Sequence, residues 1–167
     1  VRKDIRIGDY VNIQRAGDVI PQIVSVDLNK RKKHLKKYIF PTKCPSCGSQ
    51  TVKEINTNTK KVDAIRRCLD KEYKCQHIAK EKLKHFVSKD AFNIDGLGKK
   101  VIDQFWELKL IKKPSDIFNL DYTKIANLAG WGQLSAENLK NAIKRSSKIL
   151  LDKFIYSLGI RHIGEEN

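Results

Sequence analysis

Four cysteines carry the clearest chemistry in this sequence, and all of them lie between residues 44 and 75. Their spacing is Cys-x2-Cys-x20-Cys-x6-Cys, and the first pair, Cys44 and Cys47, encloses a Pro-Ser turn that is followed by Gly48. Zinc takes four thiolate or imidazole ligands in a tetrahedron, and glycine is free to adopt the left-handed conformation that such a turn often needs. We therefore predict one structural zinc ion bound by Cys44, Cys47, Cys68 and Cys75.

Two alternatives remain for this cluster: a mixed site in which His77 replaces one sulfur, and four thiols without a metal. Four protein ligands leave no open position for water or substrate, so the pattern argues against a catalytic metal. Cysteines confined to one short segment are also a poor match to a disulfide framework that staples a whole secreted chain.

Two short segments share an apolar-x-Gly-apolar-Gly pattern, Ile94-Asp-Gly-Leu-Gly98 and, 34 residues later, Leu128-Ala-Gly-Trp-Gly132. A third, weaker copy is Ile160-Arg-His-Ile-Gly164. A glycine turn that leads into a helix places amide N–H groups at the positive end of the helix dipole, where no side chain blocks a phosphate. The ordinary alternative is a glycine that only ends the preceding helix. The pattern predicts phosphate contacts at Gly96, Gly98, Lys99, Gly130, Gly132 and Gly164.

Net charge points to the same class of partner. The chain has 34 Lys and Arg against 19 Asp and Glu, a formal charge of +15, which favours a polyanion such as nucleic acid. Six basic residues fall within Leu28–Lys37. This run is either a solvated loop or a phosphate-facing one, and we predict phosphate contacts from Lys30, Arg31, Lys32 and Lys33. No apolar run of membrane-spanning length and no signal-peptide core occurs, so we expect a cytoplasmic chain without membrane contacts.

Hydrophobic periodicity predicts a multidomain α+β fold in three parts. Residues 1–40 are predicted to form strands at Val11–Gln14 and Ile20–Val26, with a turn at Ala16–Asp18 and a third strand at Leu35–Phe40. Residues 41–77 hold the cysteines and are too polar to bury a core of their own. Residues 78–167 are predicted to be all-α, with Trp131 either buried or in contact with a DNA groove. The apolar helix positions are Leu83, Phe86, Val87; Val101, Ile102, Phe105, Leu108; and Ala136, Leu139, Ile143.

Four stretches together resemble the bacterial NAD-dependent DNA ligases: Arg15–Pro21, Phe40–Gly48, His85–Gly98 and Leu158–Gly164. The resemblance spans essentially the whole chain. It implies the C-terminal part of an OB fold in residues 1–40, a small four-cysteine zinc finger in 41–77 and a helix-hairpin-helix domain in 78–167, with two complete motifs and a truncated third. It also implies that Arg15, Val19 and Ile20 lie on the OB surface that engages duplex DNA near the nick. The second and third cysteine gaps look longer than is usual in the family.

The family seals nicks in duplex DNA: NAD adenylates an enzyme lysine, AMP passes to the 5′-phosphate, and the 3′-hydroxyl displaces it. The lysine belongs to a Lys-x-Asp-Gly motif, and the only Asp-Gly in this chain, Asp95-Gly96, lacks it. The resemblance therefore implies that NAD and Mg²⁺ bind outside this segment. We expect the segment to clamp nicked double-stranded DNA as a monomer in the bacterial nucleoid, to hold no catalytic residue and to be inactive alone.

Two other functions fit parts of the pattern. A non-enzymatic DNA-binding module of a repair or junction-binding factor could use the same glycine turns, and a Lys-x-Asp-Gly segment upstream would favour the ligase over it. An RNA-binding zinc-ribbon protein would need aromatic stacking platforms for single strands, and an aromatic content of 8% offers few of them.

Overall fold

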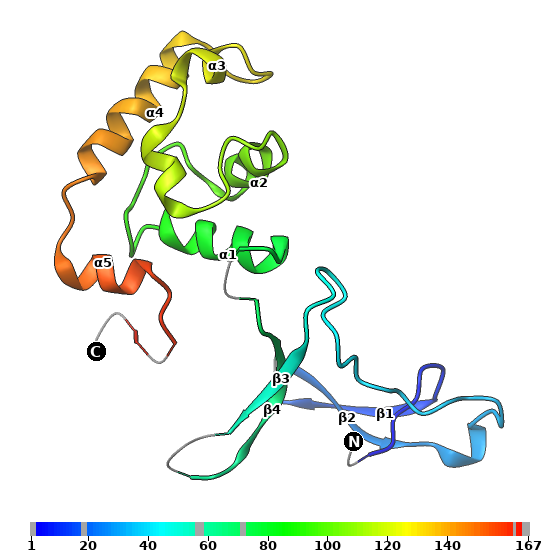
Figure 1. Ribbon diagram of the computed structural model, residues 1–167. Helices are drawn as coiled ribbons and strands as arrows, with labels where there is room; N and C mark the ends of the chain where they lie inside the picture. The colour runs from blue at the N-terminus through cyan, green and yellow to red at the C-terminus, as the bar shows by residue number, and fades with distance from the viewer. Residues whose placement is uncertain (1–2, 18–19, 56–58, 71–72, 162, 165–167) are drawn as a thin grey trace. The chain divides into compact units, whose positions relative to one another are not determined.

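The computed structural model describes residues 3–17, 20–55, 59–70, 73–161 and 163–164 (Figure 1). Internal contacts divide the chain into two compact units, Val1–Thr42 and Lys43–Asn167. The fold mixes β and α structure: within the described residues there are two separate two-stranded sheets, one in each unit, and the helices α1 to α5 follow in the second unit. The predicted three-part division at residues 40 and 77 stays a prediction.

Unit 1 is built on an antiparallel hairpin of β1 (Val11–Ala16) and β2 (Ile20–Val26), which confirms the two predicted strands. Val11 lies opposite Val26 and Ala16 opposite Ile20, with a bulge between Asn12 and Ile13. The predicted turn falls partly on Asp18, which lies outside the described residues. One hairpin cannot cover its own faces, and accordingly the side chains of Ile13 and Ile20 are 63% and 64% exposed.

The third strand predicted for Leu35–Phe40 is wrong, because this segment has no regular secondary structure. Leu35 closes a turn instead: its N–H donates to the Lys32 carbonyl (3.2 Å), and its own carbonyl accepts from the Arg6 guanidinium (2.7 Å). Its side chain also packs close to Gly8. A side-chain donor thus satisfies a carbonyl that pairing with a neighbouring strand would otherwise use.

Unit 2 begins with an antiparallel pair, β3 (Thr51–Ile55) and β4 (Val62–Cys68), in which Thr51 lies opposite Cys68. The sequence analysis predicts no strand here. A hairpin signal was nevertheless present, because β-branched residues flank the polar segment 56–61 on both sides. The hairpin explains the long gap between Cys47 and Cys68, since it carries the chain out and returns it to the first cysteine pair.

The rest of unit 2 is helical: α1 (Gln76–Phe86), α2 (Lys99–Glu107), the 3₁₀ helix η2 (Pro114–Asn119), α3 (Tyr122–Ala126), α4 (Gln133–Ser146) and α5 (Leu151–Ser157). The predicted apolar faces form one core, with Leu108 as the exception at 46% exposure because it lies beyond the end of α2. Within this core the rings of Phe86 and Phe92 stack with their centroids 4.2 Å apart. Besides Cys75, the largest fully buried side chains are Leu83, Leu97, Ile102, Phe105, Ile111, Ile117, Ile125 and Leu139.

Local capping explains two short helices that the sequence analysis does not predict. The Asp121 carboxylate accepts from the N–H groups of Thr123 and Lys124, both at 3.1 Å, and thereby starts α3. Pro114 occupies the first turn of η2, where its missing N–H costs nothing. None of the helices in the described ranges combines the length and the apolar character needed to cross a membrane.

Candidate metal centre and nucleic-acid interface

The four cysteine sulfurs come together in one cluster. Their Sγ atoms all lie within 4.8 Å of one another, with Cys44 to Cys75 at 3.9 Å and Cys47 to Cys68 at 3.5 Å. Four sulfurs arranged tetrahedrally at about 2.3 Å from one ion would be about 3.8 Å apart. The cluster therefore has the donor set and the spacing of a possible four-thiolate metal site.

The backbone around the cluster fixes the first pair on a tight turn. The Gly48 N–H donates to the Cys44 carbonyl (2.9 Å), and the Cys44 N–H donates to the Ser49 carbonyl (2.7 Å). Gly48 has φ +73°, the left-handed conformation that the sequence analysis anticipates for it. The second pair is held through Asp70, whose N–H points at the Cys68 sulfur (3.4 Å) and whose carboxylate accepts from the Cys75 N–H (2.7 Å).

The surroundings of the sulfurs shift the pKa values of two cysteines in opposite directions. Hydrogen bonds from the Ser49 side chain and backbone lower the pKa of the Cys47 thiol to about 6. The Asp70 amide lowers the pKa of Cys68, but burial and the neighbouring Cys47 and Cys44 sulfurs outweigh it and raise that pKa to about 12. One thiolate thus makes the next harder to form, and a divalent ion is the usual way to hold four together.

His77, the alternative ligand, does not join the group of possible donors found in the described part of the chain, and its side chain is exposed. Cys75 is buried and also forms the N-cap of α1, so the cluster connects directly to the helical core. The four cysteines are therefore the best-supported ligand set.

The two glycine segments adopt the same local structure. In the first glycine turn (Ile94–Gly98) the Leu97 N–H donates to the Ile94 carbonyl at 3.2 Å, and Gly96 has φ +88°. In the second glycine turn (Leu128–Gly132) the Trp131 N–H donates to the Leu128 carbonyl at 3.0 Å, and Gly130 has φ +81°. Both are turns that require a positive φ at the third residue, which glycine adopts without strain.

Each glycine turn ends at a helix N-cap. Gly98 precedes α2 and Gly132 precedes α4, both in extended conformation, and a Cβ added at either would have no atom within 4 Å. Neither helix has an acidic residue in its first turn, and α2 instead begins with the exposed pair Lys99 and Lys100. Lysines at the positive end of a helix dipole are unfavourable without an anion nearby, so the arrangement suits a phosphate.

One amide at the second turn is already used. The Gly132 N–H donates to Ser135 Oγ (2.8 Å), and that hydroxyl donates back to the Gly132 carbonyl (2.9 Å). The free amides of α4 are therefore those of its first helical residues, as at any helix start. In the third copy the Ile163 N–H repeats the turn bond to the Ile160 carbonyl (3.2 Å), and Gly164 is exposed. Residues 162 and 165–167 lie outside the described ones.

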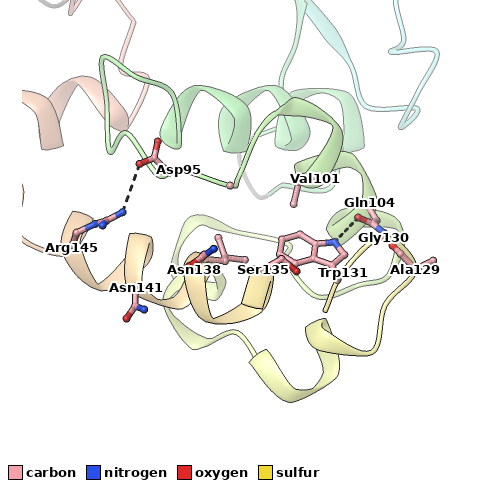
Figure 2. Close-up of a pocket in the computed structure, with 12 residues that line it drawn as sticks. Asp95, Val101, Gln104, Ala129, Gly130, Trp131, Ser135, Asn138, Asn141 and Arg145 are labelled. Atoms are coloured by element: carbon pink, nitrogen blue, oxygen red, sulfur yellow. Dashed lines mark hydrogen bonds and ion pairs between the residues drawn. The ribbon is translucent and has the colours of Figure 1, made fainter. Parts of the chain in front are cut away.

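A cleft of about 570 Å³ opens between the two glycine turns, and Gly96 and Gly130 both line it (Figure 2). Asp95 and Arg145 face each other across it at 3.8 Å. Trp131 lies at its other side, with its ring 5.3 Å from that of Phe105 and its indole N–H donating to Gln104 Oε1 (3.2 Å). Of the two interpretations of Trp131, the structure favours packing within the protein.

In unit 1 the basic run is anchored by a network of ion pairs, the Arg31 cluster (Asp4, Arg6, Asp9 and Arg31). The Arg31 guanidinium donates to both carboxylate oxygens of Asp9, at 2.8 and 2.7 Å, and to Asp4 at 2.9 Å. The Asp9 side chain has no exposed surface and that of Arg31 is 13% exposed. The donated bonds hold the pKa of the Asp9 carboxyl below its usual value. Arg31 is predicted from the sequence to contact phosphate, but in the structure its guanidinium N–H groups donate to Asp9 and Asp4.

The neighbouring lysines differ from Arg31. Lys32 and Lys33 are exposed, and they lie between two anchored residues, Arg31 at one end and Leu35 at the other. Lys30 is exposed and makes a 3.6 Å ion pair with Asp27. On the hairpin, Arg15 and Ile20 are exposed, whereas Val19 lies outside the described residues. Exposed lysines on a fixed loop have what is needed to meet phosphates.

Comparison with known proteins decides between the families considered. Residues 1–35 match the family described as NAD-dependent DNA ligase OB-fold domain. Over all 167 residues the chain is 62% identical to a DNA ligase of Pelagibacter ubique, covering 100% of this chain and 25% of that protein. This chain belongs to the NAD-dependent DNA ligase family. It is 51% identical to a DNA ligase of Azorhizobium caulinodans over 98% of the chain and 23% of the relative.

A DNA ligase of Ehrlichia chaffeensis is 49% identical over 98% of this chain and 24% of the relative. The chain thus spans about a quarter of the length of the curated ligases that it matches. The matches with these ligases extend over the cysteine cluster and the glycine turns as well as the OB-fold segment.

Proposed function

We propose that this chain is the part of a NAD-dependent DNA ligase that grips nicked duplex DNA. On this proposal the α1–α2 and α3–α4 pairs are helix-hairpin-helix motifs, the segment after α5 begins a third, and the four cysteines hold a structural zinc ion. The observation that carries the proposal is the repeated geometry of the glycine turns. Each of the two copies has the same turn hydrogen bond and a glycine with positive φ at the same position. Both copies are open to solvent, and both line the same cleft.

The chemistry of ligation belongs elsewhere in the enzyme on this proposal. The chain has no Lys-x-Asp-Gly motif, so adenylation by NAD, with Mg²⁺, would take place outside this segment. The segment would contribute positioning: it holds the nick so that the 3′-hydroxyl and the adenylated 5′-phosphate meet in line, an effect worth several kcal/mol in general. Alone it is expected to bind DNA as a monomer in the bacterial cytoplasm and to seal no nicks.

The proposed contacts follow the exposed groups. Backbone amides at Gly98 and at the start of α4, with Lys99, would bind phosphates from the helical unit, and Gly164 would do so in the third copy. Lys30, Lys32 and Lys33 would bind phosphates from unit 1, beside Arg15, Val19 and Ile20 on the hairpin. Arg31 would act as a positioning residue for the lysine loop, because its guanidinium is engaged by Asp9 and Asp4.

Binding tests the proposal directly. The chain is titrated with nicked, intact and single-stranded DNA of equal length over a salt series. We expect the tightest binding to nicked duplex, and about six phosphate contacts would give a log–log salt slope of roughly −5. Equal affinity for all three DNAs would contradict the proposal.

The glycine turns are tested by a substitution whose effects on folding and on binding have opposite signs. Aspartate is a favoured N-cap and suits the helix dipole, so Gly98→Asp and Gly132→Asp should keep or raise stability. The same carboxylate repels phosphate, and we expect duplex affinity to fall by at least about tenfold, or about 1.4 kcal/mol.

The matched control is Leu150→Asp, which adds the same charge at the exposed N-cap of α5, outside any glycine turn. Fluorescence anisotropy gives the affinities and thermal unfolding gives the stabilities. If the glycine variants lose no more affinity than Leu150→Asp, the turns are not the phosphate sites.

A further inference from the structure

Each glycine turn is held by a helix of the other helical pair. The second glycine turn is held by Gln104 of α2, whose side-chain amide bridges two of its groups. Figure 2 shows one of these two bonds, the one to Trp131. Gln104 Nε2 donates to the Ala129 carbonyl at 3.3 Å, and Gln104 Oε1 accepts from the Trp131 indole N–H at 3.2 Å. The Trp131 ring then packs on Phe105, the next residue of the same helix.

The first glycine turn rests on α4 in the same way. A Cβ placed on Gly96 would lie 3.5 Å from Leu139 Cδ1, so the turn faces that helix closely, and both residues line the cleft. The Ser146 hydroxyl, at the end of α4, donates to the Asn93 carbonyl at 3.3 Å. The exposed Asp95–Arg145 pair adds a third link at 3.8 Å. The contacts between the two pairs are therefore reciprocal, and they surround the cleft.

The two halves nevertheless differ at one position. Asn138 occupies in α4 the place that Gln104 occupies in α2, six residues after the N-cap glycine, and it lines the same cleft. In the part of the chain that the structure describes, the shorter Asn138 side chain makes no hydrogen bond to the opposite turn. Of these two residues, Gln104 alone has a side-chain amide that satisfies both a donor and an acceptor of the opposite turn.

We propose that Gln104, acting through Trp131 and Ala129, is a positioning residue that sets the spacing between the two glycine turns so that both grip one duplex at once. The inference rests on the proposed DNA-binding function. Two phosphate sites held at a fixed, matching separation bind more tightly than the same sites with a variable separation, because the matched separation raises the effective concentration at the second site. Removal of the Gln104 bridge frees the second turn while the buried core remains in place.

The test uses two variants of the whole chain that break the bridge from opposite sides. Gln104→Leu keeps a similar volume and removes both hydrogen bonds, and Trp131→Phe keeps an aromatic ring on Phe105 and removes the indole N–H. Asn138→Leu, at the equivalent position, is the control. We expect the first two variants to bind duplex DNA more weakly, with a salt slope shallower by about one for each phosphate that they no longer bind. Because Gln104→Leu already removes the bond that Trp131→Phe breaks, the double variant should be no worse than Gln104→Leu alone.

A readout independent of DNA accompanies the binding data. The chain has two tryptophans, so the indole N–H of Trp131 gives one of two NMR signals. Its hydrogen exchange should accelerate in Gln104→Leu and stay unchanged in Asn138→Leu. If Gln104→Leu lowers the melting temperature strongly, Gln104→Glu is used, because it keeps the acceptor for the indole and loses the donor to Ala129.

The outcomes separate the inference from the function on which it rests. Bridge variants that retain wild-type affinity and salt slope, while wild-type chain binds duplex, overturn the role of Gln104 alone. Wild-type chain that does not prefer duplex overturns both proposals. Weakened binding with an unchanged slope and a loss of helix content would show a purely structural role and also overturn the inference.

Discussion

Replacing Cys47 with serine is expected to abolish stable metal binding and to unfold residues 43–75 while the helical core survives. Cys47 lies 3.5 Å from Cys68 and, like the other three cysteines, has its sulfur within 4.8 Å of all of them. Structural zinc contributes on the order of 10 kcal/mol to the folding of small zinc modules. Loss of one thiolate should cost more than about a hundredfold in affinity, since changes outside the ligand shell already cost 10- to 100-fold.

The measurement is zinc per chain by mass spectrometry, together with far-UV circular dichroism. Ser46→Ala, in the same turn, and His77→Ala serve as controls, and both should retain one zinc ion. The helix signal should persist in Cys47→Ser, because the core around Leu83, Phe105 and Leu139 contains no cysteine other than the helix cap Cys75. One full equivalent of zinc in Cys47→Ser, or its loss in His77→Ala, would refute the four-cysteine assignment.

Asp9→Asn is expected to weaken DNA binding even though it makes the protein more positive. If charge alone mattered, removing a carboxylate from a +15 chain would tighten its grip on DNA. Asp9, however, accepts two hydrogen bonds from Arg31 and thereby fixes one end of the loop that presents Lys32 and Lys33. A loosened loop should no longer hold either lysine against its phosphate, which would reduce the magnitude of the salt slope by about 2.

The same pair should show a defined pH dependence. The Arg31 hydrogen bonds lower the pKa of Asp9 below its unfolded value of about 3.9. The stabilisation is therefore present above about pH 4 and is lost as the pH falls through the lowered pKa of the folded state. Asp9→Asn should remove this acid-dependent part of the stability of unit 1. Acid titration monitored by NMR of residues in that unit measures it.

Two further variants decide whether positioning is the cause. Arg31→Lys keeps the charge but cannot make the two-pronged contact with a carboxylate, so it should resemble Asp9→Asn. Asp152→Asn makes the same change in net charge at an exposed site in the first turn of α5 and should not weaken binding. Tighter binding by Asp9→Asn, equal to that of Asp152→Asn, would mean that the Arg31 cluster has no part in presenting the lysines.

Sequence reasoning predicted the structure correctly where one local requirement, such as a positive φ or an apolar face, determines the residue type. A positive φ at Gly48 follows from the turn that brings two cysteines together, and the periodic apolar residues Leu83, Ile102 and Leu139 belong to one core. The repeated glycine pattern likewise produced repeated turns with the same hydrogen bond. In each of these cases neighbours in the sequence determine the outcome.

It failed where partners are distant in the sequence. Arg31 looks like its lysine neighbours until Asp9, 22 residues earlier, is placed beside it. Strand Val62–Cys68 has weak apolar alternation, and its one sequence signal is the β-branched residues on both sides of segment 56–61; it depends on pairing with Thr51–Ile55. Leu35 looks extended, yet Arg6 captures its carbonyl. Gln104 gave no signal at all, because its two partners lie 25 and 27 residues further along the chain.

If the chain grips duplex DNA as proposed, the reciprocal contacts between the two helical pairs determine which of the two molecules changes shape on binding. Gln104 holds one glycine turn and Leu139 lies against the other, so the distance between the two turns is fixed. A duplex whose groove is too narrow or too wide must deform to fit, and the cost depends on the stiffness of its base steps. A strand break relieves that stiffness locally. Discrimination between broken and intact DNA could thus arise without any group that recognises the break itself.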